Sequence, residues 1–184
     1  MSRRAVAEVL RVLLDEGFRF TVIGGTVVEL ALGSRDLGDD VDLFTEEPSV
    51  LDEGEFLRVG EEYGWIVGQT WLGTPRLVAR ARGEDVPVEF YDNLYDFYVP
   101  PEIVEASTRI QLDGVRVRVV SVEDHIVLKA NSGRGSDMER LKEIARLYRR
   151  GRIRIDRSRL LEAVNLFDEP HVLLRRLRDA GFKL

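Results

Sequence analysis

The stretch GDDVDLF, residues 38–44, has the apolar residues of a short β-strand but carries three aspartates within four positions. Strands are normally poor in aspartate, so this composition needs a reason. Side chains two residues apart point to the same side of a strand, which places Asp40 and Asp42 together. Neighbouring carboxylates repel each other unless a cation lies between them. The stretch therefore predicts a site for divalent metal. A solvated strand edge is the alternative, and Asp39 is interpreted as a turn residue.

A third carboxylate, Glu89, lies in the segment VPVEFYD, residues 86–92. Alternation in this strand sends Val86, Val88 and Phe90 to the core and Glu89 to the opposite side. A third acidic residue from a neighbouring strand would complete a set of hard oxygen ligands that suits Mg²⁺ or Mn²⁺. The alternative is an ordinary surface glutamate, paired with Arg80 across the hairpin.

The segment VIGGTVVELALG, residues 22–33, indicates a strand, a glycine pair and the start of a helix. Gly24 and Gly25 allow the backbone to approach a ligand closely. The free N–H groups at the start of the following helix, around Thr26, favour phosphate. A plain turn between a strand and a helix would explain the same glycines.

The chain divides into a part that mixes helices with strands and a helical C-terminal part. Strands are predicted at about 18–23, 41–44, 65–73, 75–82 and 86–92, and TRIQL and VRVRVV on either side of Asp113-Gly114 predict a hairpin. Helices are predicted over 3–16, 26–33, from Pro48 and Ser49 to about Tyr63, and over 121–131, 136–150, 156–167 and 169–180. The fold class is therefore α+β: a mixed β-sheet of about five strands with flanking helices over residues 1–120, and a helical section packed on it over residues 121–184.

Composition indicates an ordinary globular protein that can bury a sizeable core. The 184 residues suit one domain, or one domain with a small appendage. No stretch approaches the roughly 20 apolar residues of a membrane span, and no secretory segment follows the first arginines, so we expect a cytoplasmic protein without membrane contact. The absence of cysteine excludes disulfides, thiolate metal sites and a cysteine nucleophile.

Charge is distributed unevenly along the chain. Residues 1–133 hold 13 basic and 25 acidic side chains, whereas residues 134–184 hold 14 basic and eight acidic ones. The segment RLYRRGRIRIDRSR, residues 146–159, has seven arginines in 14 residues. Such a density suits the phosphates of RNA or of another polyanion. A solvated helix end is the alternative.

Taken together, these motifs resemble the nucleotidyltransferase superfamily that includes DNA polymerase β. Its pattern is a Gly-Gly or Gly-Ser turn, an acidic-x-acidic strand and a third acid on a later strand. Here Gly24-Gly25 is followed by 14 residues, DVDLF and then Glu89. The likeness is closer to small prokaryotic nucleotidyltransferases related to abortive-infection and toxin–antitoxin enzymes, in which a segment like SVEDHIVLKANSGRGSDMERL, residues 121–141, follows the sheet. The resemblance covers roughly residues 18–150 and implies a nucleotidyltransferase fold.

The resemblance also implies an activity, the transfer of a nucleoside monophosphate from an NTP to an acceptor. It assigns both ions, Mg²⁺ or Mn²⁺, to Asp40 and Asp42, with Glu89 completing the acceptor-side ion and helping to activate the attacking hydroxyl. The residues implied to bind the triphosphate are Gly24, Gly25, Thr26, Lys129 and Arg134. The acceptor stays open between an RNA end, such as that of a tRNA-like molecule, a protein side chain and a small molecule.

Other residues near these motifs have structural interpretations. His125 shares a helical face with Lys129 and is expected at the helix surface or partly buried rather than as a catalytic base. Asp137 either caps the helix that starts at 136, a role for which Ser136 competes, or orients Arg134. The tryptophans Trp65 and Trp71 are expected in the core.

A second function remains open at the level of sequence, a non-catalytic module that binds a nucleotide or a partner protein. One half of a toxin–antitoxin pair, held by an antitoxin protein, would be such a module. The three carboxylates argue against it, because a pure binder has no need for them.

Overall fold

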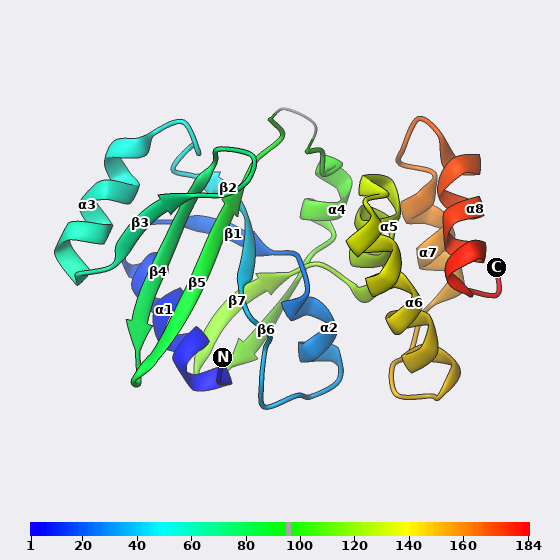
Figure 1. Cartoon of the computed structure of the whole chain (residues 1–184), viewed down its shortest axis with the longest axis horizontal. Coiled ribbons are helices and arrows are strands. Elements are labelled where there is room, and N and C mark those ends of the chain that lie inside the picture. Colours follow the sequence, from blue (N-terminus) through cyan, green and yellow to red (C-terminus); the bar gives the residue numbers. More distant parts are fainter. Residues whose placement is uncertain (95–96) are drawn as a thin grey trace. The chain divides into compact units, whose positions relative to one another are not determined.

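The computed structural model describes residues 1–94 and 97–184, and the chain forms two compact units. Unit 1 comprises Met1–Tyr98 and Ser107–Val119 and contains the β-sheet. Unit 2 comprises Val99–Ala106 and Val120–Leu184 and is helical. Figure 1 shows the strands of unit 1 and the helices of unit 2.

Unit 1 is built on a seven-stranded mixed sheet of order β3-β4-β5-β2-β1-β7-β6. The strands are β1 (Arg19–Val22), β2 (Val41–Glu47), β3 (Ile66–Gln69), β4 (Pro75–Ala81), β5 (Glu84–Tyr91), β6 (Thr108–Leu112) and β7 (Val115–Val119). Strand β2 pairs in parallel with β5 and antiparallel with β1. The α+β class is confirmed. The expected number of about five strands is wrong, because the β3-β4 and β6-β7 hairpins both join the same sheet at its opposite ends.

Three helices belong to unit 1: α1 (Arg3–Asp15), α2 (Thr26–Ala31) and α3 (Glu53–Tyr63). Helices α1 and α3 contact the sheet, and the rings of Phe18, Phe56 and Phe90 pack together with centroids 4.8 to 5.8 Å apart. Phe90 is fully buried with Val86 and Val88, as the alternation in β5 predicts. Residues between them, including Glu89, therefore point to the other face of the sheet.

Helix α3 starts later than the sequence predicts. Pro48 and Ser49 were expected to open it, but it begins at Glu53, after Asp52. The Ser49 hydroxyl accepts a hydrogen bond from the N–H of Leu51 at 3.3 Å, and its carbonyl accepts one from the N–H of Asp52 at 2.9 Å. Proline and serine suit a turn as well as a helix start, so the local signal fits both structures.

The β4-β5 hairpin also turns earlier than expected. The strands predicted over 75–82 and 86–92 leave residues 83–85 as the turn, but the loop is formed by Arg82 and Gly83, whose φ angles are 52° and 80°. Two positive φ values are typical of the two-residue turns that match the twist of a hairpin. Ala81 consequently pairs with Glu84, and this register sets every later pairing between the two strands.

Unit 2 contains α4 (Pro101–Glu105), α5 (Val122–Ser132), α6 (Gly135–Arg149), α7 (Arg157–Val164) and α8 (Pro170–Ala180). The four C-terminal helices are confirmed, whereas α4 was not predicted. The Ser121 hydroxyl caps α5 by accepting from the N–H of Asp124 at 3.0 Å. The carboxylate of Asp124 in turn binds Arg159 of α7 at 2.8 Å. In the two described stretches of chain, no helix has the length and apolar character needed to cross a membrane.

The two tryptophans differ in burial. Trp65 is 9% exposed and belongs to the core, as predicted. Trp71 is 66% exposed, so its expected core position is wrong. It lies in the loop between β3 and β4, where the alternation of a strand no longer applies.

Candidate active site

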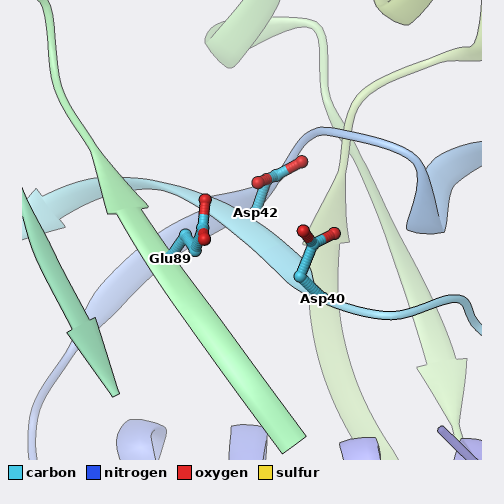
Figure 2. A group of neighbouring side chains, drawn as sticks. All are labelled: Asp40, Asp42 and Glu89. Carbon is cyan, nitrogen blue, oxygen red and sulfur yellow. The ribbon is translucent and has the colours of Figure 1, made fainter. Parts of the chain in front are cut away.

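The three predicted carboxylates meet in unit 1. One oxygen from each of Asp40, Asp42 and Glu89 lies within 4.8 Å of the others. Asp42 of β2 and Glu89 of β5 pair directly across the parallel strands, and Asp40 immediately precedes β2. Figure 2 shows the three side chains on the same side of these two strands. The convergence expected from the sequence is thus present.

The donor set fits a divalent cation. Two oxygens bound to one Mg²⁺ at roughly 2.1 Å each lie at most about 4.2 Å apart. The observed oxygens, all within 4.8 Å of one another, therefore need only small side-chain rotations to share an ion. Carboxylate oxygens are also the ligands that hard cations prefer. Asp40 is exposed while Asp42 and Glu89 are half-buried, so the cluster is accessible to ions.

The glycine pair has two different roles in the structure. Gly24 has a φ of +58°, and a β-carbon built there would lie 1.8 Å from Oδ2 of Asp42. The N–H of Ile23 donates to the carbonyl of Asp42 at 2.9 Å, which fixes this close approach. Gly25 has a helical conformation, with φ −64° and ψ −32°, and a β-carbon there would meet no atom within 4 Å. Only Gly24 is required by the packing of the protein itself.

Thr26 supports the aspartates through its side chain. It is buried, and its hydroxyl lies 3.2 Å from the carbonyl oxygens of Leu37 and Asp40. These contacts hold the segment that leads into Asp40. Because the hydroxyl is committed to these carbonyls, a contact between Thr26 and a phosphate would come from its backbone N–H.

Glu89 has two side-chain partners that the sequence did not indicate, one in an ion pair and one in a hydrogen bond. The Nε atom of Arg76 lies 3.2 Å from Oε1, and the hydroxyl of Tyr91 donates to Oε2 at 2.5 Å. Arg80, the partner of Glu89 in the alternative interpretation as a surface glutamate, instead binds Asp85 at 2.7 Å. The hairpin register places Arg80 opposite Asp85 and Arg76 opposite Glu89.

The buried position of Tyr91 determines the protonation state of its phenol. Burial raises the pKa of Tyr91, and the negative charge of Asp42 and the hydrogen bond to Glu89 raise it further. The phenol therefore stays protonated and acts as a donor. Its ring stacks on Phe97, with centroids 4.8 Å apart and an interplanar angle of 26°. Tyr91 stands two residues after Glu89, so strand alternation was a signal that could have found it, whereas Arg76 depends on the hairpin register.

A second charged cluster lies in unit 2. Asp137, whose side chain is only 4% exposed, accepts from Lys129 at 2.8 Å, from Arg134 at 2.8 Å and from the hydroxyl of Ser132 at 2.5 Å. Burial alone would raise the pKa of Asp137, but the hydrogen bonds from Lys129, Ser132 and Arg134 outweigh burial, so the pKa lies below its ordinary value. Asp137 makes no capping hydrogen bond at the start of α6, so of the two sequence-based roles the orientation of Arg134 is the correct one.

His125 is more deeply buried than the sequence suggests. Its exposed fraction is 1%, so the expected surface or partly buried position is wrong. Within residues 1–94 and 97–184, its Nε2 atom has no hydrogen-bond partner. Burial, followed by the positive charges of Lys129 and Arg140, lowers the pKa of His125 to about 3. The imidazole is therefore neutral at ordinary pH.

The arginine-rich segment 146–159 spans the end of α6 and the start of α7. Six of its seven arginines are exposed. The seventh, Arg159, is engaged with Asp124. The exposed arginines leave a strongly basic stretch of surface on unit 2.

Comparison with known proteins identifies the family. The model of a family described as nucleotidyl transferase of unknown function (DUF2204) matches residues 2–179. An antigenic nucleotidyltransferase-like protein from Paracoccidioides brasiliensis has 15% sequence identity and a TM-score of 0.59, over 97% of this chain and 86% of that protein. The antibiotic-resistance factor ANT(2'')-Ia has 16% identity and a TM-score of 0.49, over 97% and 88% of the two chains. No curated protein matches in sequence.

At 15% identity the likeness to the Paracoccidioides protein concerns the fold, which is that of nucleotidyltransferases. The family match covers nearly the whole chain and includes the glycine pair, the three carboxylates and the charged cluster of unit 2. The resemblance of the sequence to nucleotidyltransferases is therefore confirmed, and the chain belongs to the family of nucleotidyl transferases of unknown function (DUF2204).

Proposed function

We propose that the protein is a metal-dependent nucleotidyltransferase that moves a nucleoside monophosphate from an NTP to an acceptor hydroxyl. The observation that carries this proposal is the convergence of Asp40, Asp42 and Glu89 within 4.8 Å. Membership of a nucleotidyl transferase family supports it. A structural cluster of three acids without a cation would be unfavourable, because like charges this close repel.

Asp40 and Asp42 would hold two Mg²⁺ or Mn²⁺ ions between them, and Glu89 would complete the ligands on the acceptor side. When bound, such ions neutralise the charge of the triphosphate and make the attacking hydroxyl more acidic. The chain contributes fixed carboxylates, since Asp42 is locked against Gly24 and Glu89 against Arg76 and Tyr91. Phosphoryl transfer demands mainly such positioning and charge neutralisation.

At the α-phosphorus the reaction forms one bond and breaks one, and the acceptor hydroxyl loses its proton. The acceptor oxygen bonds to the α-phosphorus of the NTP, and the bond from that phosphorus to the oxygen bridging to the β-phosphate breaks. Pyrophosphate leaves with the electron pair of that bond. The hydroxyl proton passes to Glu89 and from there to solvent. No atom changes its oxidation state, so the reaction needs no oxidant or reductant.

Two sets of residues are proposed to bind the triphosphate. The backbone N–H groups of Gly25 and Thr26 lie at the start of α2, where N–H groups have no acceptor within the helix. We assign Lys129 and Arg134 as the cations that neutralise the remaining phosphate charge. Asp137 holds both of these side chains in one position, which lowers the entropic cost of using them.

An RNA end is the acceptor that the charge of unit 2 favours. Six exposed arginines within residues 146–159 would bind backbone phosphates. Binding of an RNA acceptor should weaken steeply as the salt concentration rises. Binding of a protein or of a small neutral acceptor should depend much less on salt.

The function is tested by incubating the protein with each of the four NTPs, labelled at the α-phosphate, and with Mg²⁺ or Mn²⁺ and total RNA, total protein or neither. We expect label in one acceptor fraction, and we expect Asp42→Asn to abolish it. Asp39→Asn is the matched control, because Asp39 is exposed in the adjacent turn. Transfer that survives Asp42→Asn would refute the metal assignment. Tight NTP binding without any transfer would favour the non-catalytic module instead.

A further inference from the structure

Three charged residues form one row across three neighbouring strands. Asp42 of β2 pairs with Glu89 of β5, and Glu89 pairs with Arg76 of β4. Paired residues of adjacent strands project their side chains to the same face of the sheet. The row therefore places the guanidinium of Arg76 directly beside the carboxylate of Glu89, with Nε 3.2 Å from Oε1. Glu89 in turn lies next to Asp42.

Tyr91 approaches Glu89 along its own strand. The two residues are two positions apart in β5 and share a face, and the Tyr91 hydroxyl donates to Oε2 at 2.5 Å. Tyr91 is only 7% exposed and its ring is stacked on Phe97. The donor is thus fixed by packing and does not depend on Glu89 for its own position.

The ion pair with Arg76 and the hydrogen bond from Tyr91 involve different oxygens of the same carboxylate. A free glutamate side chain samples many rotamers, and fixing it in one of them costs conformational entropy. Arg76 on Oε1 and Tyr91 on Oε2 define both the rotamer and the plane of the Glu89 carboxylate. The remaining lone pairs of the two oxygens stay available for other partners.

We propose that Tyr91 and Arg76 are positioning residues that hold the Glu89 carboxylate toward Asp40 and Asp42, so that the three acids are arranged before a cation arrives. The proposal rests on the function proposed above. It adds that the geometry of the third ligand is set by a phenol and a guanidinium outside the carboxylate cluster. Partners of metal ligands typically contribute about 10- to 100-fold in affinity or activity.

The test measures Mn²⁺ binding directly, by electron paramagnetic resonance of the full-length protein without nucleotide. We expect Tyr91→Phe to weaken Mn²⁺ binding by about tenfold. The matched control is Tyr63→Phe, which removes a similar tyrosine–glutamate hydrogen bond, 2.6 Å long, from Tyr63 to Glu16 of unit 1. This control should bind Mn²⁺ like the wild type. In the transfer assay, Tyr91→Phe should lower kcat and leave the KM for NTP unchanged.

A double-substitution cycle separates positioning from general loss of stability. In a Glu89→Gln background, Tyr91→Phe should change Mn²⁺ affinity no further, because its effect acts through Glu89. An equal loss in both backgrounds would overturn the proposal, as would wild-type Mn²⁺ affinity in Tyr91→Phe alongside a loss in Asp42→Asn. In both of those outcomes the proposed function stands. A wild-type protein that binds no Mn²⁺ would overturn the proposed function as well.

Discussion

Gly24 and Asp42 approach each other so closely that a β-carbon on residue 24 would lie 1.8 Å from Oδ2 of the aspartate. The positive φ of Gly24 adds strain for any other residue. We expect Gly24→Ala to displace the Asp42 carboxylate, to lower stability by about 1–3 kcal/mol and to abolish transfer. Thermal melts and the labelling assay measure the two effects. Wild-type turnover in this variant would contradict the close contact.

Gly25→Ala should behave differently, although the two glycines are neighbours. Gly25 is already helical and has open space around its missing β-carbon, so the substitution should leave stability unchanged or raise it by roughly 0.4–1 kcal/mol. If phosphates bind at this turn, the added methyl group meets them, and the KM for NTP should rise about tenfold or more with a folded protein. An unchanged KM would remove Gly25 from the phosphate site.

The predictable part of this site came from local patterns. Asp40, Asp42 and Glu89 could be found because strand alternation decides on which side a residue lies, and the core positions of Val88 and Phe90 followed from the same rule. The pairing register of the β4-β5 hairpin could not be predicted in this way, since it depends on which two residues form the turn. The turn is formed by residues 82 and 83, so Glu89 lies opposite Arg76 and not beside Arg80, its partner in the alternative interpretation.

Long-range contacts were also beyond the sequence. The hydroxyl of Thr26 binds carbonyls 11 and 14 residues further along the chain, so nothing in its neighbours indicates that it supports Asp40. His125 is polar but fully buried in a helix whose apolar residues do not form a single stripe, which hid its position. Capping was one of the two roles that the sequence indicated for Asp137. In the structure its carboxylate instead binds the charged side chains of Lys129 and Arg134.

Arg76→Gln tests the charge beside Glu89. Removing the positive charge of Arg76 beside the three carboxylates should favour a metal ion there electrostatically, while the loss of the ion pair frees the Glu89 side chain. We therefore expect turnover to fall by about tenfold, with Mn²⁺ affinity at least as high as in the wild type. Arg80→Gln is the control, since it removes the exposed pair with Asp85 on the same strand. Equal effects of the two variants would show that Arg76 has no special role.

Asp137→Asn should destabilise unit 2 by about 2 kcal/mol at neutral pH, because charge-assisted hydrogen bonds to Lys129 and Arg134 are lost. The pKa of Asp137 is lowered in the folded protein, so its stabilising charge is fully present above the ordinary value of 3.8 and is lost as the pH falls through the folded pKa. The difference in the free energy of unfolding between variant and wild type, measured with urea, should therefore shrink as the pH falls below 3.8.

The control for this substitution is Glu139→Gln, on the same helix. Glu139 pairs with Lys142 at 2.7 Å, but the glutamate side chain is 68% exposed. An exposed pair contributes about 0–1 kcal/mol, so Glu139→Gln should have little effect. Equal losses from Asp137→Asn and Glu139→Gln would contradict the central role of Asp137 in the cluster of unit 2.

His125→Leu should make the protein more resistant to acid. The pKa of His125 is lowered from 6.5 to about 3 in the folded protein, so between these values the unfolded chain binds a proton that the folded one does not. Stability therefore falls as the pH drops from 6.5 toward 3, on the order of 1 kcal/mol per pH unit from this residue. Leucine cannot bind a proton, and the substitution also removes the unpartnered Nε2 atom. Stability at pH 7 should therefore change little, while the dependence of the unfolding free energy on pH becomes less steep.

Urea unfolding at a series of pH values measures this slope. His171→Leu, at an exposed position, should leave it unchanged, and an unaltered slope in His125→Leu would show that the buried imidazole does not control acid unfolding.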